Sequence, residues 1–319
     1  MSECSSIRLG VVGTGRIARK FMGEASVVSG LEVIAACNPN EQSARSFCRE
    51  HAIDCAFSNL EDMLTAVDAV YIASPHATHF EYGMLALSAG VHVLCEKPIA
   101  LSAEGAHLLY EQARISGVAF LDGIKTAYYP AFSALEEFLE SGRIGQVVDV
   151  EASFTKLLPS GLPELSSDGS GGSMMWLSSY PLYAIARIMG TCPRSVDFYS
   201  LVNDEGVDIF MRGVLGYERG SASFKVGFGA KTDGNMVVTG TEGFVVVPAP
   251  WWNTRAFQVR FEDPTLLEEY EYELEGYGMR YEIEEFVRLI RAETSMSDRL
   301  METESVFMAK VLEEFRGAE

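Results

Sequence analysis

The stretch that decides the fold is IRLGVVGTGRIARKFMGEASVV, residues 7–28. Its first seven residues are mostly apolar, as expected of a strand that is buried on both faces of a sheet. From residue 16 onward the apolar residues return at the spacing of a helix. Two glycines, Gly13 and Gly15, lie between the two patterns. The stretch therefore predicts a buried strand, a tight turn and a helix, which together open a parallel α/β sheet.

The same alternation of strand and helix patterns continues to residue 122. After the first strand and helix, we expect strands at 31–37, near 56, and at 68–74, 91–97 and 118–122. We expect helices at 41–51, 60–66 and 79–90, and a helix capped by Ser102 at 103–117. Short apolar strands that alternate with helices indicate a doubly wound parallel sheet of the Rossmann type, covered on both faces.

A different pattern begins at residue 123. Strands now follow one another, with glycine turns such as Glu242-Gly243 that suit hairpins. We expect these strands at 146–157, 195–202, 208–217, 221–230, 236–240, 243–250 and 256–263, and helices near 130–141, after Gly172, and at 279–293 and 298–315. The sequence therefore predicts an N-terminal Rossmann domain, residues 1–122, and a C-terminal α/β domain, residues 123–319, with a large, mostly antiparallel open sheet.

The composition excludes several classes of protein. Acidic residues number 45 against 25 basic ones, and the formal net charge of −20 argues against nucleic acid or an anionic membrane as partner. No run of about 18 apolar residues suggests a membrane span. The six cysteines form no CxxC pair, and the N-terminus has no signal-peptide pattern. We therefore expect a reduced, cytoplasmic protein without a metal site.

The glycine turn carries a dinucleotide-binding pattern, Gly13-x-Gly15-x-x-Ala18. Gly13 permits the tight turn, Gly15 lets the backbone approach a pyrophosphate, and Ala18 lets the helix pack closely on the strand. The N-terminus of the helix supplies N–H groups and a positive potential. We therefore expect NAD or NADP to bind at this turn, through Gly13, Thr14, Gly15, Arg16 and Ile17.

The residue that would contact the ribose of the dinucleotide is an amide. In NAD-binding sheets an acid at the end of the second strand binds the ribose hydroxyls, but this chain has Asn38 there. An amide can still bond a hydroxyl, and it does not repel a 2′-phosphate. No arginine adjoins Asn38 in the sequence, and Arg45 lies within the following helix. Asn38 therefore favours NAD while leaving NADP open, and it can equally form the turn before Pro39.

Four stretches, in this order, give the chain a family resemblance: GVVGTGRIARKF (10–21), ASPHATHFEYG (73–83), CEKPIAL (95–101) and GGSMMWLSSYPLYA (171–184). They resemble the glucose–fructose oxidoreductase / inositol dehydrogenase / MocA (Gfo/Idh/MocA) family, whose most specific mark is the Glu-Lys-Pro tripeptide. The resemblance implies an NAD(P)-dependent oxidoreductase that acts on sugars, polyols or dihydrodiol-like small molecules. It also implies a homodimer or homotetramer that associates through the C-terminal sheet.

The resemblance assigns roles to individual residues. It implies that Lys97 lies at the carboxyl end of a strand, beside the nicotinamide, and the family's lysine–proline bond is often cis. On this side the expected cofactor contacts are Ser74, Pro75, His76, His79, Glu96 and Lys97. The expected substrate contacts are Lys125, Phe154, Trp176 and Tyr180. Either histidine could instead cap the following helix.

Lys97 and Tyr180 are the expected catalytic acid–base pair. Tyr180 stands where members close to dimeric dihydrodiol dehydrogenase carry a tyrosine. A free phenol has a pKa near ~10, and a cation within a few ångströms lowers that pKa by about 1–3 units. The pair would then exchange a proton with the substrate while hydride moves to or from the nicotinamide. The alternatives are a surface ion pair between Glu96 and Lys97 and a tyrosine that only packs in the core.

Trp176 departs from the family pattern. Many members carry an acid four residues before the tyrosine, whereas this chain has a tryptophan there, expected one helical turn from Tyr180 on the same face. Tryptophan cannot accept a proton. Trp176 therefore indicates a substrate that is apolar or aromatic at that end, catalysis by Lys97 and Tyr180 alone, or a loss of turnover. In the last case the chain would be a sensor or regulatory subunit that holds NAD(P) and a small ligand.

Overall fold

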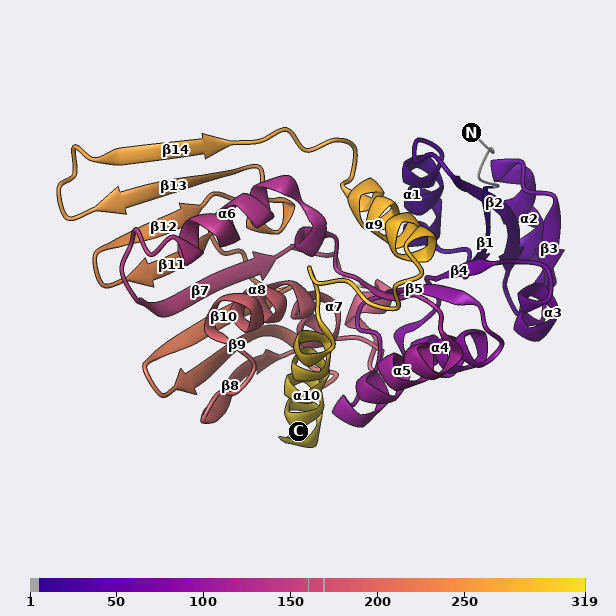
Figure 1. The fold of residues 1–319 in the computed structure, drawn as a ribbon. Helices are drawn as coiled ribbons and strands as arrows, with labels where there is room; N and C mark the ends of the chain where they lie inside the picture. Colours follow the sequence, from indigo (N-terminus) through magenta and orange to yellow (C-terminus); the bar gives the residue numbers. More distant parts are fainter. Residues whose placement is uncertain (1–5, 160, 169, 319) are drawn as a thin grey trace. The chain divides into compact units, whose positions relative to one another are not determined.

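The structure is a computed structural model that describes residues 6–159, 161–168 and 170–318. The chain divides into two compact units (Figure 1). Unit 1 contains the residues up to Lys125 together with Glu275–Ala309, and unit 2 contains Thr126–Leu274 together with the residues from Lys310 onward. The chain therefore leaves the first unit after Lys125 and returns to it at Glu275.

Unit 1 is built on a six-stranded parallel sheet with the order β3-β2-β1-β4-β5-β6. Its strands are β1 (Ile7–Val12), β2 (Leu31–Cys37), β3 (Cys55–Phe57), β4 (Ala69–Ile72), β5 (His92–Glu96) and β6 (Phe120–Gly123). Its helices are α1 (Arg16–Ala25), α2 (Glu41–His51), α3 (Leu60–Leu64), α4 (His79–Ser88), α5 (Ala103–Ser116) and α9 (Met279–Arg291). The strand order reverses between β1 and β4, and open parallel sheets bind their ligands at the carboxyl ends beside such a reversal. The predicted Rossmann sheet is confirmed.

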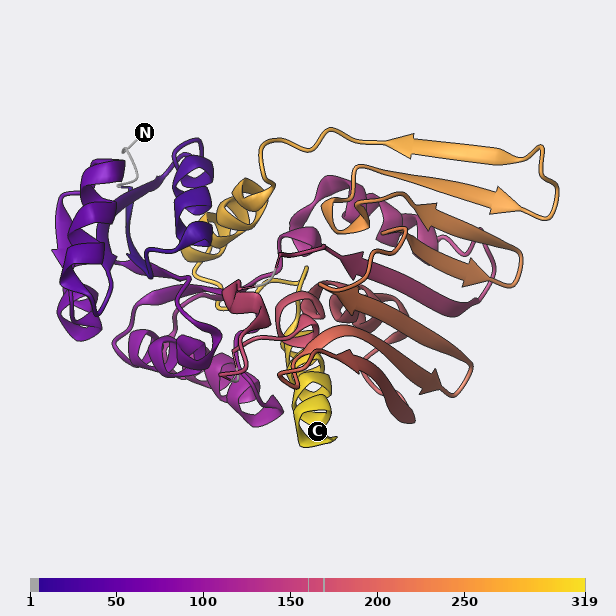
Figure 2. The same ribbon diagram turned by 180° about the vertical axis from the view of Figure 1, so that it is seen from behind.

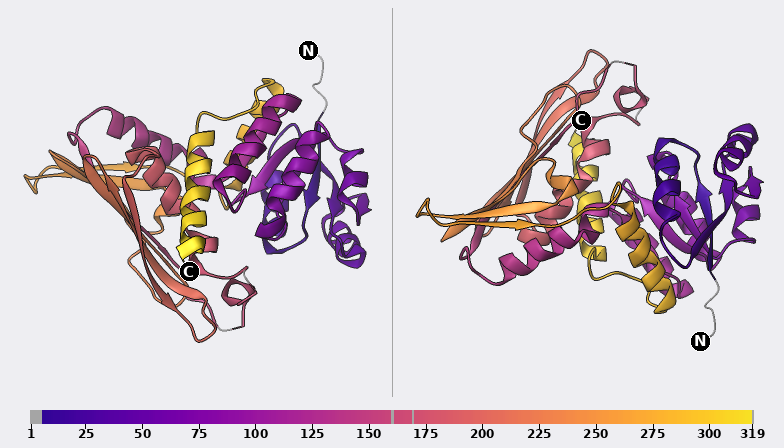
Figure 3. Two further views of the ribbon diagram at one scale, coloured as in Figure 1. Left: turned by 90° about the horizontal axis from the view of Figure 1, so that it is seen from below. Right: turned by 90° about the horizontal axis from the view of Figure 1, so that it is seen from above.

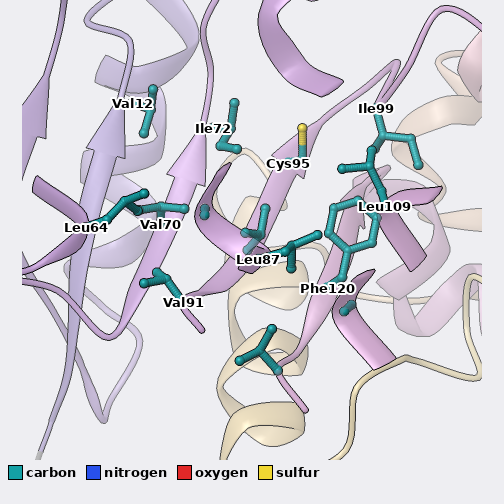
Figure 4. Close-up of a cluster of buried hydrophobic side chains, with 14 of the residues drawn as sticks. Val12, Leu64, Val70, Ile72, Leu87, Val91, Cys95, Ile99, Leu109 and Phe120 are labelled. Atoms are coloured by element: carbon teal, nitrogen blue, oxygen red, sulfur yellow. The ribbon is translucent and has the colours of Figure 1, made fainter. Parts of the chain in front are cut away.

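Alternating strand residues attach helices to both faces of this sheet. On one face, Val70 and Phe120 pack in an apolar cluster with Leu109 of α5 (Figure 4). On the other face, Phe21 of α1 stacks on Tyr71 of β4, with ring centroids 3.8 Å apart. Because helices cover both faces, the strands are held in place from two sides.

Unit 2 is built on an eight-stranded sheet with the order β14-β13-β12-β11-β7-β10-β9-β8. Its strands are β7 (Val147–Thr155), β8 (Ser195–Val202), β9 (Asp208–Tyr217), β10 (Gly220–Gly227), β11 (Met236–Gly240), β12 (Gly243–Val247), β13 (Ala256–Phe261) and β14 (Leu267–Glu271). Neighbouring strands run antiparallel except β7 and β10, which are parallel. The predicted large, mostly antiparallel sheet is confirmed.

Helices line one face of the second sheet. They are α6 (Pro130–Glu140), α7 (Ser173–Leu177) and α8 (Ser179–Met189). The opposite face can be followed in Figure 2, and the sheet is seen from below and from above in Figure 3. Helix α10 (Glu302–Ala318) belongs to unit 1 through Ala309 and to unit 2 from Lys310 onward. In the described part of the chain, no helix is long and apolar enough to cross a membrane.

Two elements differ from the sequence prediction. The sequence does not predict strand β14, because three of its five residues are glutamates, which are uncommon in strands. It lies at the edge of the sheet, where alternate side chains face water. The single helix expected after Gly172 is two helices, α7 and α8, which meet at Ser178. The backbone of Ser178 keeps helical angles, φ −67° and ψ −26°, so apolar periodicity alone does not reveal the boundary.

Candidate functional site

The glycine turn between β1 and α1 leaves open space at one of its two glycines. Gly13 has a φ of +97°, and a Cβ added there would lie 2.5 Å from the carbonyl oxygen of Ala73, so the fold itself requires glycine. A Cβ added at Gly15 would meet no described atom within 4 Å. The packing of the protein therefore does not require glycine at position 15, whereas a ligand lying against the backbone would.

The first turn of α1 is open to an anion. Gly15 is its N-cap, and in the described chain no side chain bonds to the cap and no acid lies in the first turn. Ala18 is fully buried, as close packing of helix and sheet requires. Thr14 and Ile17 are half-buried and Arg16 is exposed. The N–H groups of a helix's first turn and the positive end of its dipole suit the pyrophosphate of a dinucleotide.

Asn38 lies beside this turn. Its Nδ2 donates to Thr14 Oγ1 at 2.9 Å, and its Oδ1 accepts from the backbone N–H of Asn40, also at 2.9 Å. The structure therefore brings the expected ribose contact and the expected phosphate loop together at the carboxyl ends of β1 and β2, where the adenosine half of a dinucleotide binds in Rossmann sheets.

Arg19 reaches the same turn and is a residue that the sequence analysis missed. Its Nη1 donates to the carbonyl oxygen of Thr14 at 2.6 Å, and its Nε lies 3.1 Å from a carboxylate oxygen of Glu50 on α2. Arg19 precedes Asn38 in the chain by 19 positions, so it does not adjoin the expected ribose contact in the sequence. The helical spacing could have found it, because Arg19 lies four residues after Gly15, one turn along α1.

His79 ties the loop after β4 to the loop after β5. Its Nδ1 lies 2.9 Å from the carbonyl oxygen of Pro98, and its Nε2 lies 2.8 Å from that of Ser74. Burial lowers the pKa of His79, while the two carbonyl oxygens raise it. The ring is 1% exposed. His79 therefore fixes the position of Ser74 against the segment that contains Lys97.

His76 lies in the same loop, directly after the exposed Pro75. The rings of His76 and His79 meet edge to face, with centroids 5.6 Å apart. Burial, and then the charge of Lys97, lower the pKa of His76 to about 2. The imidazole of His76 is therefore neutral at physiological pH and can donate or accept a hydrogen bond without carrying charge.

Lys97 directly follows β5, and its peptide bond to Pro98 is cis. Burial lowers the pKa of Lys97, while the carboxylates of Glu96 and Asp122 raise it. Glu96 is buried and accepts a hydrogen bond from the hydroxyl of Tyr71 at 2.7 Å. The net effect lowers the pKa of Lys97, because burial outweighs the two carboxylates, which favour its charged form.

Lys125 belongs to the same charged group within unit 1. Its Nζ donates to the carbonyl oxygen of Tyr277 at 3.1 Å. Burial lowers the pKa of Lys125, and Glu282 of α9 and Glu96 raise it. Glu282 is 1% exposed. The sequence pointed to Lys125 but not to Glu282, which lies far along the chain from the Glu-Lys-Pro segment.

In unit 2, three aromatic side chains form a row. Phe154 of β7 stacks on Trp252, with ring centroids 3.8 Å apart and planes at 12°. It also meets Tyr180 of α8 at 5.4 Å and 63°. All three rings are half-buried. Phe154 and Tyr180 are thus brought together, and Trp252 joins them although its place in the sequence suggests nothing of the kind.

Trp176 stands on α7, whereas Tyr180 stands on α8. The expectation of one helical turn within a single helix is therefore replaced by two helices that meet at Ser178. The indole Nε1 of Trp176 donates to the carbonyl oxygen of Ser170 at 2.8 Å, and the ring is half-buried. No group of three or more His, Cys, Asp or Glu side chains among the described residues could hold a metal ion.

Comparison with known proteins places these features in a family. Residues 7–123 match the oxidoreductase family with an NAD-binding Rossmann fold, and residues 132–246 match the GFO/IDH/MocA C-terminal domain. The chain is 29% identical to scyllo-inositol 2-dehydrogenase (NADP(+)) IolU of Bacillus subtilis, over 97% of this chain and 96% of the relative. It is 28% identical to trans-1,2-dihydrobenzene-1,2-diol dehydrogenase of Bos taurus, over 98% and 97%.

A solved structure shows the same fold. The 3-ketoreductase KijD10 of Actinomadura kijaniata, in complex with NADP and TDP-benzene, matches with a TM-score of 0.84 and 22% identity, over 98% of each chain. The likeness covers both sheets. With the glycine turn, the Glu-Lys-Pro segment and matches in both domains, the chain belongs to the Gfo/Idh/MocA family and is an NAD(P)-dependent oxidoreductase.

Proposed function

We propose that the protein transfers hydride between NAD(P) and a secondary alcohol, or the matching carbonyl, of a sugar, a cyclic polyol or a dihydrodiol-like molecule. Residues 1–122 would bind the dinucleotide and residues 123–319 the substrate. The names of the Bacillus and Bos relatives, which describe an inositol dehydrogenase and a dihydrodiol dehydrogenase, support this substrate class. The row of Phe154, Trp252 and Tyr180 also supports it, because aromatic rings pack well against the apolar faces of ring-shaped substrates.

Within this reaction, Lys97 and Tyr180 act as the acid–base pair. Bound NAD(P) supplies the hydride acceptor or donor. In the oxidative direction the phenolate of Tyr180 takes the hydroxyl proton of the substrate, and the ammonium of Lys97 stabilises that phenolate. In the reductive direction Tyr180 returns the proton. The observation that carries this proposal is a half-buried Lys97 at the carboxyl end of β5 with carboxylates beside it.

Trp176 is the observation that favours a second candidate function. It replaces the acid expected at this position, and its indole N–H is already bonded to Ser170. A chain that binds NAD(P) and a ligand through Phe154 and Trp252, without turnover, would be a sensor or regulatory subunit. The two functions differ in one measurable respect, because only the enzyme changes the oxidation state of the nicotinamide.

The test is a substrate panel with both oxidised cofactors. The purified chain is incubated with NAD⁺ or NADP⁺ and with inositols, aldose sugars and trans-dihydrodiols, and the absorbance of the reduced nicotinamide is followed. We expect turnover with at least one compound, and its loss in Tyr180→Phe. Saturable cofactor binding without reduction by any compound would instead support the sensor.

We also propose that the chain forms a homodimer or homotetramer through the sheet of unit 2. On β8, Phe198 packs against Phe315 of α10, so Tyr199 and Leu201 point to the opposite face. There they are 65% and 55% exposed. Light scattering should give a multiple of the 35.0 kDa chain mass, and Tyr199→Lys should lower it. A monomer at all concentrations would contradict the proposal.

A cytoplasmic location completes the proposal. Five cysteines in the described residues are free thiols, and Cys37, Cys48 and Cys95 are buried. Free buried thiols are typical of a reducing compartment. Fractionation of cells that express the tagged full chain should recover it with cytoplasmic markers.

A further inference from the structure

A second buried carboxylate, that of Asp122, acts on Lys97 from the face of the sheet opposite to Glu96. Cys95 of β5 and Asp122 of β6 are paired in the parallel register, so their side chains point to the same face. That face also carries Phe120, which is buried in the cluster beneath α5. Glu96 follows Cys95 and points to the other face. Lys97, at the tip of β5, therefore has a carboxylate on each side of the sheet.

A chain of buried hydroxyls orients this carboxylate. Ser305 of α10 donates from Oγ to Asp122 Oδ2 at 2.8 Å. The hydroxyl oxygens of Ser305 and Tyr110 lie 2.9 Å apart. Because the single hydroxyl proton of Ser305 is directed to Asp122, Tyr110 is the donor in this second bond. The three side chains are at most 2% exposed, and they come from β6, α10 and α5.

Lys97 is the positively charged group among the titratable side chains that interact with Asp122. The titratable groups that interact with Asp122 are Cys95, Glu96, Lys97, Tyr110 and Glu282. Of these groups, Lys97 is the cation. Burial raises the pKa of Asp122 to about 7, with the bond from Ser305 and the charge of Lys97 acting against burial. Glu96 is shared by more partners, because it also accepts from Tyr71 and interacts with Lys125.

We propose that Asp122 is a positioning residue, whose carboxylate is oriented by Ser305 and Tyr110 and holds Lys97 as an ammonium ion. A carboxylate beside a buried amine favours the charged form of the amine. The proposed acid–base pair needs that form, because an uncharged Lys97 would not stabilise a phenolate. The inference rests on the proposed function and adds to it the group that keeps Lys97 charged when the site excludes water.

The proton affinity of Lys97 can be measured without a substrate. Acetic anhydride reacts with uncharged amines, so trace labelling of the full chain across pH, read by mass spectrometry, gives a titration midpoint for each lysine. Asp122→Asn keeps the shape and the acceptor for Ser305 but removes the charge. We expect the Lys97 midpoint to fall by about one unit or more, which is about tenfold more uncharged amine at neutral pH. The exposed Lys310 in the same digest should not shift.

Two further variants make the result specific. Glu285→Gln is the matched control, because Glu285 is also buried and accepts from a serine, Ser297, but pairs with Arg288. It should leave the Lys97 midpoint unchanged. Ser305→Ala keeps the carboxylate but removes its donor, so the Lys97 midpoint should fall by less than in Asp122→Asn. If Asp122→Asn does not fold, this second variant carries the test.

The possible outcomes separate the inference from the proposed function. A Lys97 midpoint that stays within about 0.3 unit of wild type in the folded variants overturns the inference, whatever the turnover. A midpoint that shifts as expected, together with full turnover in Lys97→Met, supports the charge pairing and refutes the acid–base role of Lys97. A shift of the Lys97 midpoint by the same amount in Glu285→Gln would also overturn the inference. The effect would then not depend on the position of Asp122 beside Lys97.

Discussion

At the scale of single residues, the two glycines of the nucleotide turn have different reasons to be glycine. Gly13 has a positive φ, and the carbonyl oxygen of Ala73 occupies the space of a Cβ. Gly15 has neither constraint, since its φ is −82° and the space beside it is open. The fold explains why position 13 is glycine, whereas a ligand that lies against the backbone would explain Gly15.

This difference predicts different outcomes for two substitutions. Gly15→Val places a branched side chain where we expect the pyrophosphate to bind, so cofactor affinity should fall at least about tenfold while the melting temperature barely changes. Gly13→Ala should instead lower the melting temperature, because it forces a Cβ against Ala73. Fluorescence titration with NADH or NADPH and thermal melts measure both. Undiminished binding by Gly15→Val would show that the dinucleotide binds elsewhere.

The proposed pair predicts a characteristic pH dependence. Lys97→Met removes the cation, so the phenol of Tyr180 ionises only near its ordinary pKa. Turnover at neutral pH should drop by ~10²–10⁴ and recover in part toward pH ~10 in the oxidative direction. Tyr180→Phe should not recover, because no phenol remains. The rate of nicotinamide reduction across pH measures this.

The double variant provides the control for this pair. Residues that act as a unit are not additive, so Lys97→Met with Tyr180→Phe should lose little more than Tyr180→Phe alone. Fully additive losses would mean that Lys97 acts directly on the substrate. Near-normal turnover in Tyr180→Phe would remove the tyrosine from the mechanism and direct attention to His76, which is held neutral beside Lys97.

The sequence could predict those site residues that belong to a short motif, and could not predict those that reach the site through the fold. The contact of Asn38 with Thr14 follows from the βαβ pattern, because the ends of adjacent parallel strands meet. The bond from Ser305 to Asp122 joins residues more than 180 positions apart, and no local spacing encodes it. Trp252 joins Phe154 for the same reason, through the pairing of distant strands.

At the scale of elements, regular periodicity was sufficient to locate most strands and helices. Strand β2 and helix α2 have the predicted bounds, 31–37 and 41–51. The sequence failed where packing overrides local preference. Strand β14 is rich in glutamate and is stabilised by pairing with β13, and the parallel pairing of β7 with β10 brings together strands that other elements separate in the chain. These pairings are determined by the packing of the whole sheet rather than by the local sequence of one segment.

At the element scale, we expect the ion pair between α1 and α2 to influence the choice between NAD and NADP. Arg19 of α1 is the cation at the Asn38 turn, and Glu50 of α2 pairs with it. Glu50→Gln frees this charge for a 2′-phosphate, so the ratio of NADP to NAD affinity should rise about three- to tenfold, less at high salt. Parallel titrations with the two cofactors measure the ratio.

A matched variant on the same helix gives the control. Glu41 of α2 is also exposed and also pairs with an arginine, Arg45, but neither contacts Thr14 in the described hydrogen bonds. Glu41→Gln should therefore leave the ratio unchanged. Asn38→Asp should shift it the other way, toward NAD, because a carboxylate repels a 2′-phosphate. Equal ratios in Glu50→Gln and wild type would exclude Arg19 from cofactor choice.

At the scale of the whole molecule, two kinds of carboxyl group make stability depend on pH in opposite directions. The hydrogen bond from Arg8 lowers the pKa of Asp68, and that from Arg143 lowers the pKa of Glu268. Such groups stabilise the folded state at neutral pH and lose that contribution as the pH falls. Asp122 is the opposite case, because burial raises its pKa from 3.8 to about 7. The net charge of −20 adds repulsion on the alkaline side.

The direction in which Asp122 makes stability depend on pH follows from the number of protons bound to it in the folded and unfolded states. Below pH ~4 both the folded and the unfolded chain hold this carboxyl protonated, so Asp122 costs the folded state no stability. Between pH 4 and pH 7 the unfolded chain loses the proton first, so stability falls as the pH rises. The raised pKa corresponds to a loss on the order of 4 kcal/mol at most.

Asp122→Asn should therefore separate stability from catalysis. The amide cannot ionise, so the variant should gain much more stability over wild type at pH 8 than at pH 4.5, while its turnover falls because Lys97 loses its counter-ion. Urea unfolding at the two pH values, with the slope of the transition held constant, measures the difference in unfolding free energy. The same gain at both pH values would show that Asp122 is ionised in the folded state throughout. The buried carboxylate would then carry no pH-dependent cost, and its charge would be balanced by Lys97 over the whole range.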